Sequence, residues 1–430
     1  MRLPGHLSIV NGELRVNGVS LTRLADEYGT PLYILSIDRV REKFRSLMSR
    51  VREYWEEVLI CYAYKANTTL ALLKALKNEG AGAEVVSRGE LYAAKLVGVA
   101  PHKVVFNGVC KLEEEIADAI EYGVGLLNIE NLGEMDVIKR VIERFGLSST
   151  VFGVRVNLDV PAETHEYIST GMRIHKFGLD PENALKAYVA LIKLVGANRC
   201  MGVHIHIGSQ ILSVEPFESA VKKLISFCRI LKNKLGVKIG IVDLGGGLGI
   251  PYEADQREFP LEIYCEAVLK PIVDSIGDVF LADSLIILEP GRYLVGDAGV
   301  LLARVRYVKE TAGIKWILID AGMNDLIRPA LYGAKHRVVV VGKADLEPRE
   351  RYWIGGPICE SSDVFARDCL LPKVEPGDLI ALLDTGAYGI SMASQYNCRP
   401  RPPVVVVDDG EVRLARRRES IGDLFSCEIF

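Results

Sequence analysis

The sequence predicts two domains, a (β/α)8 barrel of the TIM type followed by an all-β domain. Short apolar runs recur between residues 58 and 289, and most of them are separated by amphipathic helical stretches. Repeated strand–helix units form a parallel sheet covered by helices, and eight units over about 250 residues match a closed barrel. After Arg292 the helical spacing stops, and short strands with turns between them follow.

The N-terminal segment alternates apolar and polar residues around two turns, Asn11-Gly12 and Asn17-Gly18, which indicates a β-ribbon that joins the all-β domain. From about Pro31 the rhythm changes, and a helix is predicted from Asp38 to about Trp55. The predicted barrel strands are Val58–Tyr64, Ala83–Ser87, Lys103–Gly108, Gly125–Glu130, Val151–Leu158, Met201–Gly208, Lys238–Leu244 and Leu285–Glu289.

Helices and later strands complete the pattern. Amphipathic helices are predicted at Arg88–Val97, Leu112–Tyr122 and Val214–Leu235. The later strands are Val300–Val308, Trp316–Asp320, Arg337–Val341, Tyr352–Ile354, Leu379–Leu382 and Val404–Val407. We expect residues 33–290 to form the barrel. Residues 1–32 and 291–430 would form a discontinuous β-sandwich or β-barrel domain that completes the substrate site. An open doubly wound sheet is less favoured, because no early G-x-G-x-x-G follows the first strand.

Composition limits the classes of function. The chain has 430 residues, 49% hydrophobic and 25% charged, which indicates a soluble globular protein. Its formal net charge of -4 does not indicate a surface that binds nucleic acid, and its only dense basic run is Arg416–Arg418. No signal peptide and no apolar stretch long enough for a membrane helix is recognisable. The nine cysteines form no C-x-x-C pair, so we expect reduced thiols in a cytoplasmic protein without a metal site.

Barrel enzymes carry their active sites at the C-terminal ends of their strands, so candidate site residues are expected at those ends. The first predicted strand ends in Tyr64-Lys65-Ala66. Desolvation at a barrel mouth would lower the pKa of the Lys65 amine and make it a nucleophile. The alternative is a lysine that reaches from a strand edge into solvent.

The sixth and seventh strand ends add a ring and an anion site. His204 and His206 alternate along the strand and would share a face. They suggest a metal site, but no third ligand is paired with them, and a flat imidazole over an aromatic ligand fits equally well. Gly245, Gly246 and Gly247 would let backbone N–H groups approach a phosphate, which barrels often bind after strands seven and eight. A flexible turn is the alternative.

The eighth strand end supplies an acid. It reads Glu289-Pro290-Gly291-Arg292 and would place a carboxylate on the last strand, opposite Lys65 on the first. A carboxylate near a pyridine nitrogen favours the protonated ring, which is a strong electron sink. An amine, an anion cradle, a flat partner and an acid together predict a site for pyridoxal 5'-phosphate.

At these residues the chain resembles the fold-type III pyridoxal-phosphate decarboxylases, which have the alanine racemase-like fold, and within them the diaminopimelate decarboxylase family. The resemblance runs from Pro31-Leu32-Tyr33 to Tyr396-Asn397. Its motifs are Tyr64-Lys65-Ala66-Asn67, His206-Ile207-Gly208-Ser209-Gln210, Gly245-Gly246-Gly247, Glu289-Pro290-Gly291-Arg292, Arg328-Pro329-Ala330-Leu331-Tyr332, Gly356-Pro357-Ile358-Cys359-Glu360-Ser361-Ser362-Asp363 and Gly386-Ala387-Tyr388-Gly389.

The resemblance implies roles for these residues. Lys65 would bind the cofactor covalently, His206 would stack on its ring, and Glu289 would pair with its ring nitrogen. The other cofactor-binding residues would be Ser209, Gly245, Gly246, Gly247, Pro290, Gly291, Arg292 and Tyr388. The distal carboxylate of the substrate would meet Arg292, Arg328 and Tyr332, its distal amino group Glu360, and Tyr388 would reach both substrate and phosphate.

The resemblance also implies an assembly. Cys359 and Glu360 would enter the site from a partner subunit, which makes the active unit a head-to-tail homodimer with shared active sites. Cys359 would join Lys65 and His206 as a catalytic residue, because it is the expected proton donor. The alternative for Cys359 is an inert buried thiol. The segment His165–Gly171 is a candidate for lying near the site.

The implied reaction converts meso-2,6-diaminopimelate to L-lysine and CO2, the last step of lysine biosynthesis. The alternatives are a decarboxylase of ornithine, arginine or lysine on the same fold, or a non-catalytic homologue. Arg292 and Arg328 suit a distal carboxylate, whereas a racemase of this fold would place an arginine where Glu289 stands. Two positions depart from the family pattern, Glu84 in place of Asp and Arg88 in place of a small residue. Neither is expected to touch the groups that do chemistry.

Overall fold

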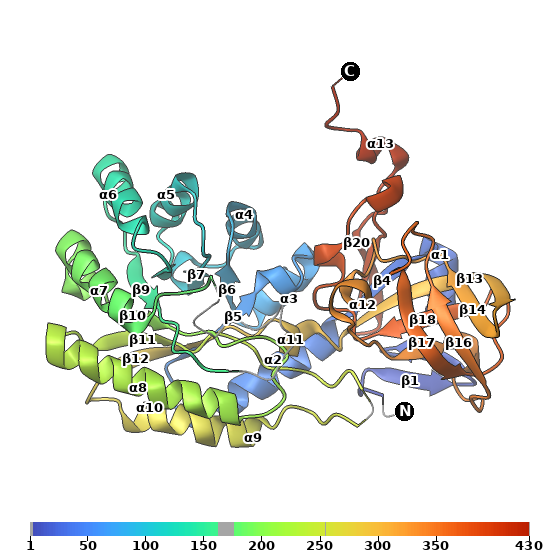
Figure 1. Ribbon diagram of the computed structural model, residues 1–430, viewed down its shortest axis with the longest axis horizontal. Coiled ribbons are helices and arrows are strands. Elements are labelled where there is room, and N and C mark those ends of the chain that lie inside the picture. Colours follow the sequence, from blue (N-terminus) through green and yellow to red (C-terminus); the bar gives the residue numbers. More distant parts are fainter. Residues whose placement is uncertain (1–2, 162–175, 254, 430) are drawn as a thin grey trace.

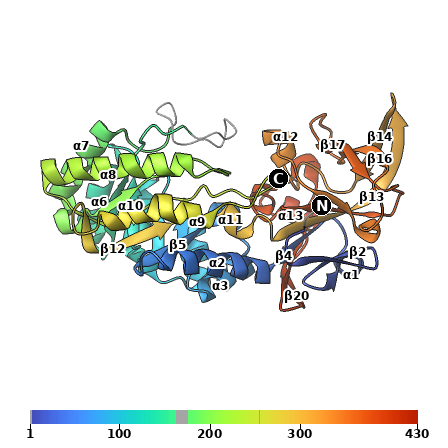
Figure 2. The same ribbon diagram turned by 90° about the horizontal axis from the view of Figure 1, so that it is seen from below.

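The computed structural model describes residues 3–161, 176–253 and 255–429. The segment His165–Gly171 lies outside the described residues. Two bodies lie end to end, a barrel ringed by helices and a β-rich body that carries both ends of the drawn chain (Figures 1 and 2). This arrangement bears out the predicted combination of a (β/α)8 barrel with a β domain.

Eight parallel strands close into the barrel. Each predicted barrel strand is present, and the closure is made where Ile286, Ile287 and Leu288 pair with Val58, Leu59 and Ile60. The apolar runs form strands here because both faces are buried, one by the barrel interior and one by helices. The strands are β5 (Val58–Ala63), β6 (Gly82–Val85), β7 (Val104–Phe106), β8 (Leu126–Ile129), β9 (Val151–Arg155), β10 (Gly202–His204), β11 (Ile239–Asp243) and β12 (Phe280–Leu288).

Helices cover the barrel from outside (Figure 1). Their starts follow local capping rules: the Asp180 side chain accepts from the N–H groups of Glu182 and Asn183 at the start of α7. The helix α8 buries Phe217 and Leu224 and ends at Gly236, which has a left-handed backbone. The barrel helices are α2 (Ile37–Arg52), α3 (Leu70–Asn78), α4 (Arg88–Val97), α5 (Glu113–Tyr122), α6 (Glu134–Phe145), α7 (Pro181–Val195), α8 (Glu215–Leu235), α9 (Leu261–Tyr264) and α10 (Lys270–Asp274).

The second body is built on a nine-stranded mixed sheet. Its long central strand β13 pairs with β4, β14 and β18. The strands are β4 (Leu32–Ser36), β13 (Gly299–Thr311), β14 (Ile314–Ile319), β15 (Val338–Val340), β16 (Glu350–Gly355), β17 (Val364–Leu371), β18 (Leu379–Leu383), β19 (Val404–Asp408) and β20 (Glu411–Arg416). Short helices accompany it: α11 (Arg292–Val295), α12 (Arg328–Tyr332) and α13 (Ile421–Leu424).

The N-terminal ribbon meets the second body by packing rather than by strand pairing. Strands β1 (Leu7–Val10), β2 (Glu13–Val16) and β3 (Val19–Ser20) form a separate three-stranded sheet, followed by α1 (Leu21–Tyr28). Their buried side chains share one apolar cluster with strands β13 and β18. The strand that enters the mixed sheet is β4, which pairs with β13 and β19. The division of the chain at residues 32 and 290 stays a prediction, although β4 itself lies in the mixed sheet.

The bodies share a continuous core. Buried side chains of the barrel, among them Tyr62 and Phe106, belong to one apolar cluster with Tyr33 and Leu301 of the mixed sheet. This packing holds the loops of the second body against the barrel mouth, where the predicted site residues lie. Within the described ranges, no helix is both long and apolar enough to cross a membrane.

Candidate active site

The turn that carries Lys65 is held from both bodies. Strand β5 ends at Ala63, and Lys65 stands in a single 3-10 turn, Tyr64–Ala66, beyond it. Tyr388 donates its backbone N–H to the carbonyl of Ala66 at 2.8 Å, and Asn67 Nδ2 donates to the carbonyl of Gly386 at 2.9 Å. The loop after β18 is therefore fixed beside the lysine, which brings Tyr388 to the site predicted from sequence.

Lys65 has a buried acidic neighbour that the sequence did not reveal. Its Nζ donates to Glu84 Oε2 at 2.7 Å, and Glu84 is buried. Burial opposes the charged amine, but the Glu84 carboxylate, with smaller contributions from Tyr388 and Glu289, raises the pKa of Lys65 above its usual range. The expectation that desolvation lowers this pKa is therefore wrong. The expectation that Glu84 touches no reacting group is wrong too, because its carboxylate contacts the lysine directly.

Arg88, the second departure from the family pattern, lies outside the site. It is exposed at the start of α4, and its Nε donates to Asp118 Oδ2 at 2.5 Å. The helix start itself is as expected, because Ser87 accepts from the N–H of Glu90. Arg88 thus stabilises the outer surface between two helices and touches no reacting group.

Asn107 joins the acids of the barrel mouth into one hydrogen-bonded chain. Its Nδ2 donates to Glu289 Oε1 at 2.7 Å and to Glu84 Oε1 at 3.2 Å. Its Oδ1 accepts from Asn128 Nδ2 at 2.8 Å, which fixes which way the amide points. Asn107 was not predicted as a site residue. It follows strand β7 directly, and a polar residue at the end of a barrel strand could have identified it.

Glu289 is charged inside the barrel because its neighbours compensate for its burial. Burial raises the pKa of a carboxyl group, but His204, Lys65 and a hydrogen bond from Asp243 together lower the pKa of Glu289. Burial and the Glu289 charge raise the pKa of Asp243, which therefore carries the proton of that hydrogen bond. His204 Nε2 lies 3.3 Å from Glu289 Oε2. His204 therefore lies beside Glu289 and helps to keep that carboxylate charged, whereas His206 lines the cavity.

A single cavity brings most of the predicted residues together. It is lined by Ala63, Lys65, His206, Ser209, Gly247, Leu248, Glu289, Gly291, Arg292, Tyr332 and Tyr388. Gly245, Gly246 and Pro290 lie in the loops that carry these residues and do not line the cavity themselves. Lys65 and Glu289, which were predicted at the ends of the first and the last barrel strand, therefore face one cavity.

The glycine loop leaves no room for side chains. A Cβ at Gly246 would lie 2.2 Å from the carbonyl oxygen of Glu289, and Gly247 has a φ of +105°, which favours glycine. The N–H of Gly246 donates to His206 Nδ1 at 3.1 Å, and burial lowers the pKa of His206, so its imidazole is neutral. Within the described residues, the N–H groups of Gly247, Gly291 and Arg292 donate no hydrogen bond. These free donors suit a phosphate.

Of the two predicted arginines, Arg292 lines the cavity, whereas Arg328 does not line it and is linked to Arg292 through the side chain of Tyr252. Arg292 Nη1 donates to Tyr252 Oη at 2.9 Å, and its Nη2 donates to Ser209 Oγ at 3.2 Å. Arg328 Nη1 donates to His336 Nε2 at 2.9 Å, and its guanidinium lies 4.6 Å from the centre of the Tyr252 ring. Within the described part of the chain, neither guanidinium forms an ion pair with a carboxylate. Tyr252 and His336 were not predicted from sequence.

Cys359 and Glu360 are not brought to this cavity. Both are exposed, the backbone N–H of Cys359 donates to Asn397 Oδ1 at 2.9 Å, and Glu360 Oε1 accepts from Tyr396 Oη at 2.5 Å. Within one chain these two residues therefore stand apart from Lys65. The loop that carries them borders a second cavity instead.

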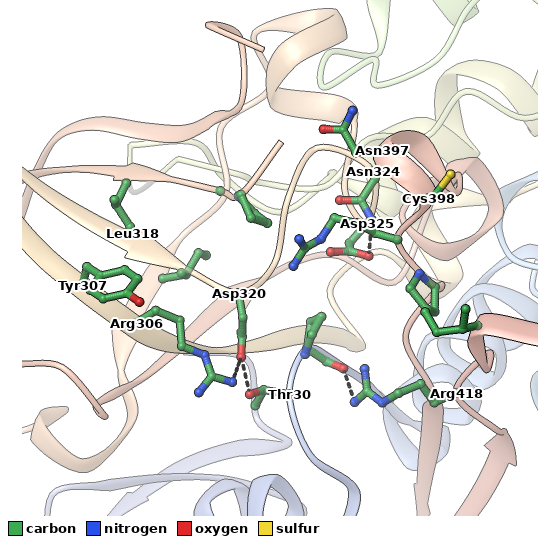
Figure 3. A pocket seen from close by; sticks show the side chains of 17 residues that line it. Thr30, Arg306, Tyr307, Leu318, Asp320, Asn324, Asp325, Asn397, Cys398 and Arg418 are labelled. Carbon is green, nitrogen blue, oxygen red and sulfur yellow. Dashed lines mark hydrogen bonds and ion pairs between the residues drawn. The ribbon is translucent and has the colours of Figure 1, made fainter. Parts of the chain in front are cut away.

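This second cavity holds none of the predicted site residues (Figure 3). Arg306 Nη2 and Thr30 Oγ1 both donate to Asp320 Oδ2 at 2.7 Å in its lining. Arg418 reaches the carbonyl of Pro31 at 2.9 Å. Gly356, Pro357 and Asn397 border it, so it adjoins the loop of Cys359. Lys65 itself lines the first cavity.

The barrel mouth defines a class of enzyme. Pyridoxal phosphate has an aldehyde, a phosphate and a ring nitrogen, and it needs an amine, an anion cradle and an acid at matching places. Lys65, the free N–H groups around Gly247 and the charged Glu289 meet those needs across one cavity. The chain is thus a pyridoxal-phosphate enzyme built on a (β/α)8 barrel.

Comparison with known proteins gives the family. The model of the pyridoxal-dependent decarboxylase family, pyridoxal binding domain, matches residues 38–296, well over half of the chain. Diaminopimelate decarboxylase of Aquifex aeolicus is 41% identical over 96% of this chain and 95% of its own length. This chain therefore belongs to the pyridoxal-dependent decarboxylases and, within them, to the diaminopimelate decarboxylase family.

Solved structures agree with that assignment. A crystal structure of diaminopimelate decarboxylase from Methanocaldococcus jannaschii superposes with a TM-score of 0.92 at 40% identity, covering 99% of this chain and 98% of that one. The Helicobacter pylori enzyme, solved in complex with L-lysine, has a TM-score of 0.86 at 36% identity over 95% of this chain and 98% of its own.

Proposed function

We propose that this enzyme releases CO2 from meso-2,6-diaminopimelate and produces L-lysine, the last step of lysine biosynthesis. The observation that carries the choice of substrate is the pair Arg292 and Arg328. Both are buried, and within the described residues neither has a carboxylate partner. Two buried guanidinium groups without an anion are unfavourable until one binds, and a distal carboxylate supplies it.

Different residues of the barrel mouth would bind different parts of the cofactor. Lys65 would bind it, and the neutral ring of His206 would lie against its face. The N–H groups of Gly247, Gly291 and Arg292 would hold the phosphate, in loops that also contain Gly245, Gly246, Pro290 and Ser209. Glu289, charged through His204 and Asp243, would keep the ring nitrogen protonated. Bound pyridoxal phosphate supplies a sink for the electron pair that CO2 leaves behind.

The far end of the cavity selects the substrate. Arg292, Arg328 and Tyr332 would bind the distal carboxylate, and Tyr388 stands between that end and the phosphate. Ornithine, arginine and lysine end in a cationic group and have no distal carboxylate. Two guanidinium groups would repel that cation. The lysine/ornithine decarboxylase of Vibrio vulnificus, at 23% identity and a TM-score of 0.76, shares the fold alone. The diamine-forming reactions are therefore the disfavoured alternative.

The active unit we propose is a homodimer, in which Cys359 and Glu360 complete the partner's cavity. The support is that both side chains are exposed and lie outside the cavity of their own chain. There Cys359 would return a proton to the carbon that lost CO2, and Glu360 would bind the distal amino group. We place the enzyme in the cytoplasm, since none of the nine cysteines forms a disulfide.

Product analysis tests this function. Purified protein loaded with pyridoxal phosphate is incubated with meso-diaminopimelate, and lysine and CO2 are both quantified. The proposal predicts equal amounts of the two, and no product after borohydride treatment of the loaded protein. Loaded protein that binds the cofactor but releases no CO2 would contradict it.

A further inference from the structure

We infer that His336 and Tyr252 form an uncharged scaffold that positions Arg292 and Arg328 for a substrate carboxylate. This inference rests on the proposed function and deepens it, because it names the residues that hold the selectivity of the cavity. Arg292 lines the cavity and Arg328 does not, and neither His336 nor Tyr252 lines it. Both are positioning residues that act through the two guanidinium groups.

The His336 ring has a defined orientation. Its Nδ1 lies 2.9 Å from the carbonyl oxygen of Leu383, an acceptor, so Nδ1 carries the hydrogen and donates it. Nε2 is left with a lone pair, which accepts from Arg328 Nη1 at 2.9 Å. Strand β18 thereby fixes the ring, and the ring fixes the arginine. Burial and the neighbouring Arg328 lower the pKa of His336 to about 3, so the imidazole stays neutral.

Tyr252 joins the two arginines. Its hydroxyl accepts from Arg292 Nη1 at 2.9 Å, and its ring faces the Arg328 guanidinium, whose central carbon lies 4.6 Å from the ring centre. The ring stands edge-on to His336 with centroids 5.4 Å apart. One phenol side chain thus touches both cations and the histidine, and a movement of any of the four residues would displace the others.

The scaffold is uncharged, and this leaves the charges of the two arginines available to a ligand. A glutamate or aspartate could orient an arginine equally well, but it would neutralise the guanidinium. A neutral imidazole and a phenol orient both groups and leave both positive charges for a ligand. In addition, Arg292 Nε and Arg328 Nε are buried and donate no hydrogen bond within the described residues. The two arginines are therefore held in place by the scaffold but have no anion bound to them.

Substitutions at His336 separate positioning from folding. His336→Gln offers an amide oxygen near the position of Nε2 and should keep much of the wild-type KM. His336→Phe removes the acceptor and should raise KM for diaminopimelate about 10- to 100-fold with a smaller change in kcat, as for the loss of a hydrogen bond to a charged group. His336→Glu should raise KM at least as much, because it gives Arg328 a carboxylate of its own. His102→Gln, on the exposed surface, is the matched control and should leave KM unchanged.

The cofactor absorbance and a milder variant show what each substitution has lost. The visible absorbance of the lysine-bound cofactor should stay at the wild-type level in every variant, because none of the changed residues contacts Lys65. Tyr252→Phe, which removes only the hydroxyl, should raise KM less than His336→Phe does. If the His336 variants do not fold, this milder variant alone decides: an unchanged KM overturns the scaffold.

Ligand binding separates failure of this inference from failure of the proposed function. Change in the cofactor band is titrated with 2-aminopimelate, which has a distal carboxylate, and with norleucine, which has none. Wild-type preference for 2-aminopimelate that His336→Glu abolishes supports the scaffold, even if diaminopimelate is not decarboxylated. Turnover of diaminopimelate with an unchanged KM in His336→Phe and His336→Glu would overturn the scaffold and leave the proposed function standing.

Discussion

Lys65 Nζ and Glu84 Oε2 are 2.7 Å apart, so the amine that we propose takes up the cofactor is held as an ammonium by a buried carboxylate. An amine must lose its proton before it can attack an aldehyde. Glu84 therefore works against the first capture of the cofactor, although it fixes the lysine in place. Asn107 links the same carboxylate to Glu289, so the lysine and the acid of the ring nitrogen are held by one chain of hydrogen bonds.

Removal of the Glu84 charge should speed cofactor capture. Glu84→Gln keeps an acceptor for Asn107 but lowers the pKa of Lys65, because the largest attraction for the ammonium is lost. Each unit by which that pKa falls raises the neutral fraction about 10-fold at neutral pH. The rate at which the visible cofactor band appears in cofactor-free protein should rise, and its pH midpoint should fall. Arg88→Ser is the control, and an unchanged midpoint in Glu84→Gln would contradict the ion pair.

Lys65→Ala should abolish both turnover and covalent capture of the cofactor. The reason is that, among the residues that the structure describes, no other lysine lines the cavity. Borohydride reduction followed by peptide mapping checks this, with Lys95→Ala on the outer surface of α4 as the control. Label retained on another lysine would refute the assignment of Lys65.

Arg328→Ala should mainly raise KM for diaminopimelate. The loss of one partner of a buried charge pair corresponds to about 2–4 kcal/mol. Steady-state kinetics on loaded enzyme measure this, and exposed Arg351→Ala serves as the matched control. A KM that does not change would remove Arg328 from the substrate site.

Mixed dimers test whether subunits share active sites. Lys65→Ala and Cys359→Ala should each be inactive alone, but after subunit exchange one site of the mixed dimer would contain both wild-type residues. We expect up to about a quarter of wild-type activity from a one-to-one mixture, since half of the dimers are mixed and each has one intact site. Exchange confirmed by mass spectrometry without recovery of activity would count against the shared site.

Asp325 should make the fold less stable as pH rises. Burial raises its pKa to about 7, above the ~3.9 of an unfolded aspartate. The folded state therefore holds a proton that the unfolded state has lost, so stability is greatest below about pH 4 and falls as pH rises to about 7, by at most ~1.4 kcal/mol per pH unit. Asp325→Asn should show a smaller fall in thermal midpoint between pH 5 and 8. A fall equal to that of wild type and of exposed Asp136→Asn would contradict the raised pKa.

The barrel could be predicted because its strands are buried on both faces. A strand such as β5 is a continuous apolar run, and the run itself marks the element. Strands β17 and β20 were missed because they carry exposed and charged residues, such as Arg367, Asp368 and Arg413, and their strand conformation depends on pairing with β16 and β19. Local sequence does not encode that pairing.

The site was predictable where a residue stands at a strand end. Lys65 and Glu289 follow strands directly, so the topology of a barrel placed both at one mouth. Asn107 also follows a strand directly, and this signal was overlooked. Tyr252 and His336 were missed for a different reason. Tyr252 meets Arg292, 40 residues away, and His336 meets Leu383, 47 residues away, so their roles exist only in three dimensions. The raised pKa of Lys65 likewise depends on a carboxylate from the next strand.

The most direct test of the central claim is the rate of CO2 release from four substrates. Diaminopimelate, lysine, ornithine and arginine are compared on the same loaded enzyme, and kcat/KM is determined for each. The charges of Arg292 and Arg328 predict that diaminopimelate is decarboxylated at least about 100-fold more efficiently than the other three, as expected for one charge-assisted carboxylate contact. Equal or faster release from lysine, ornithine or arginine would contradict the account.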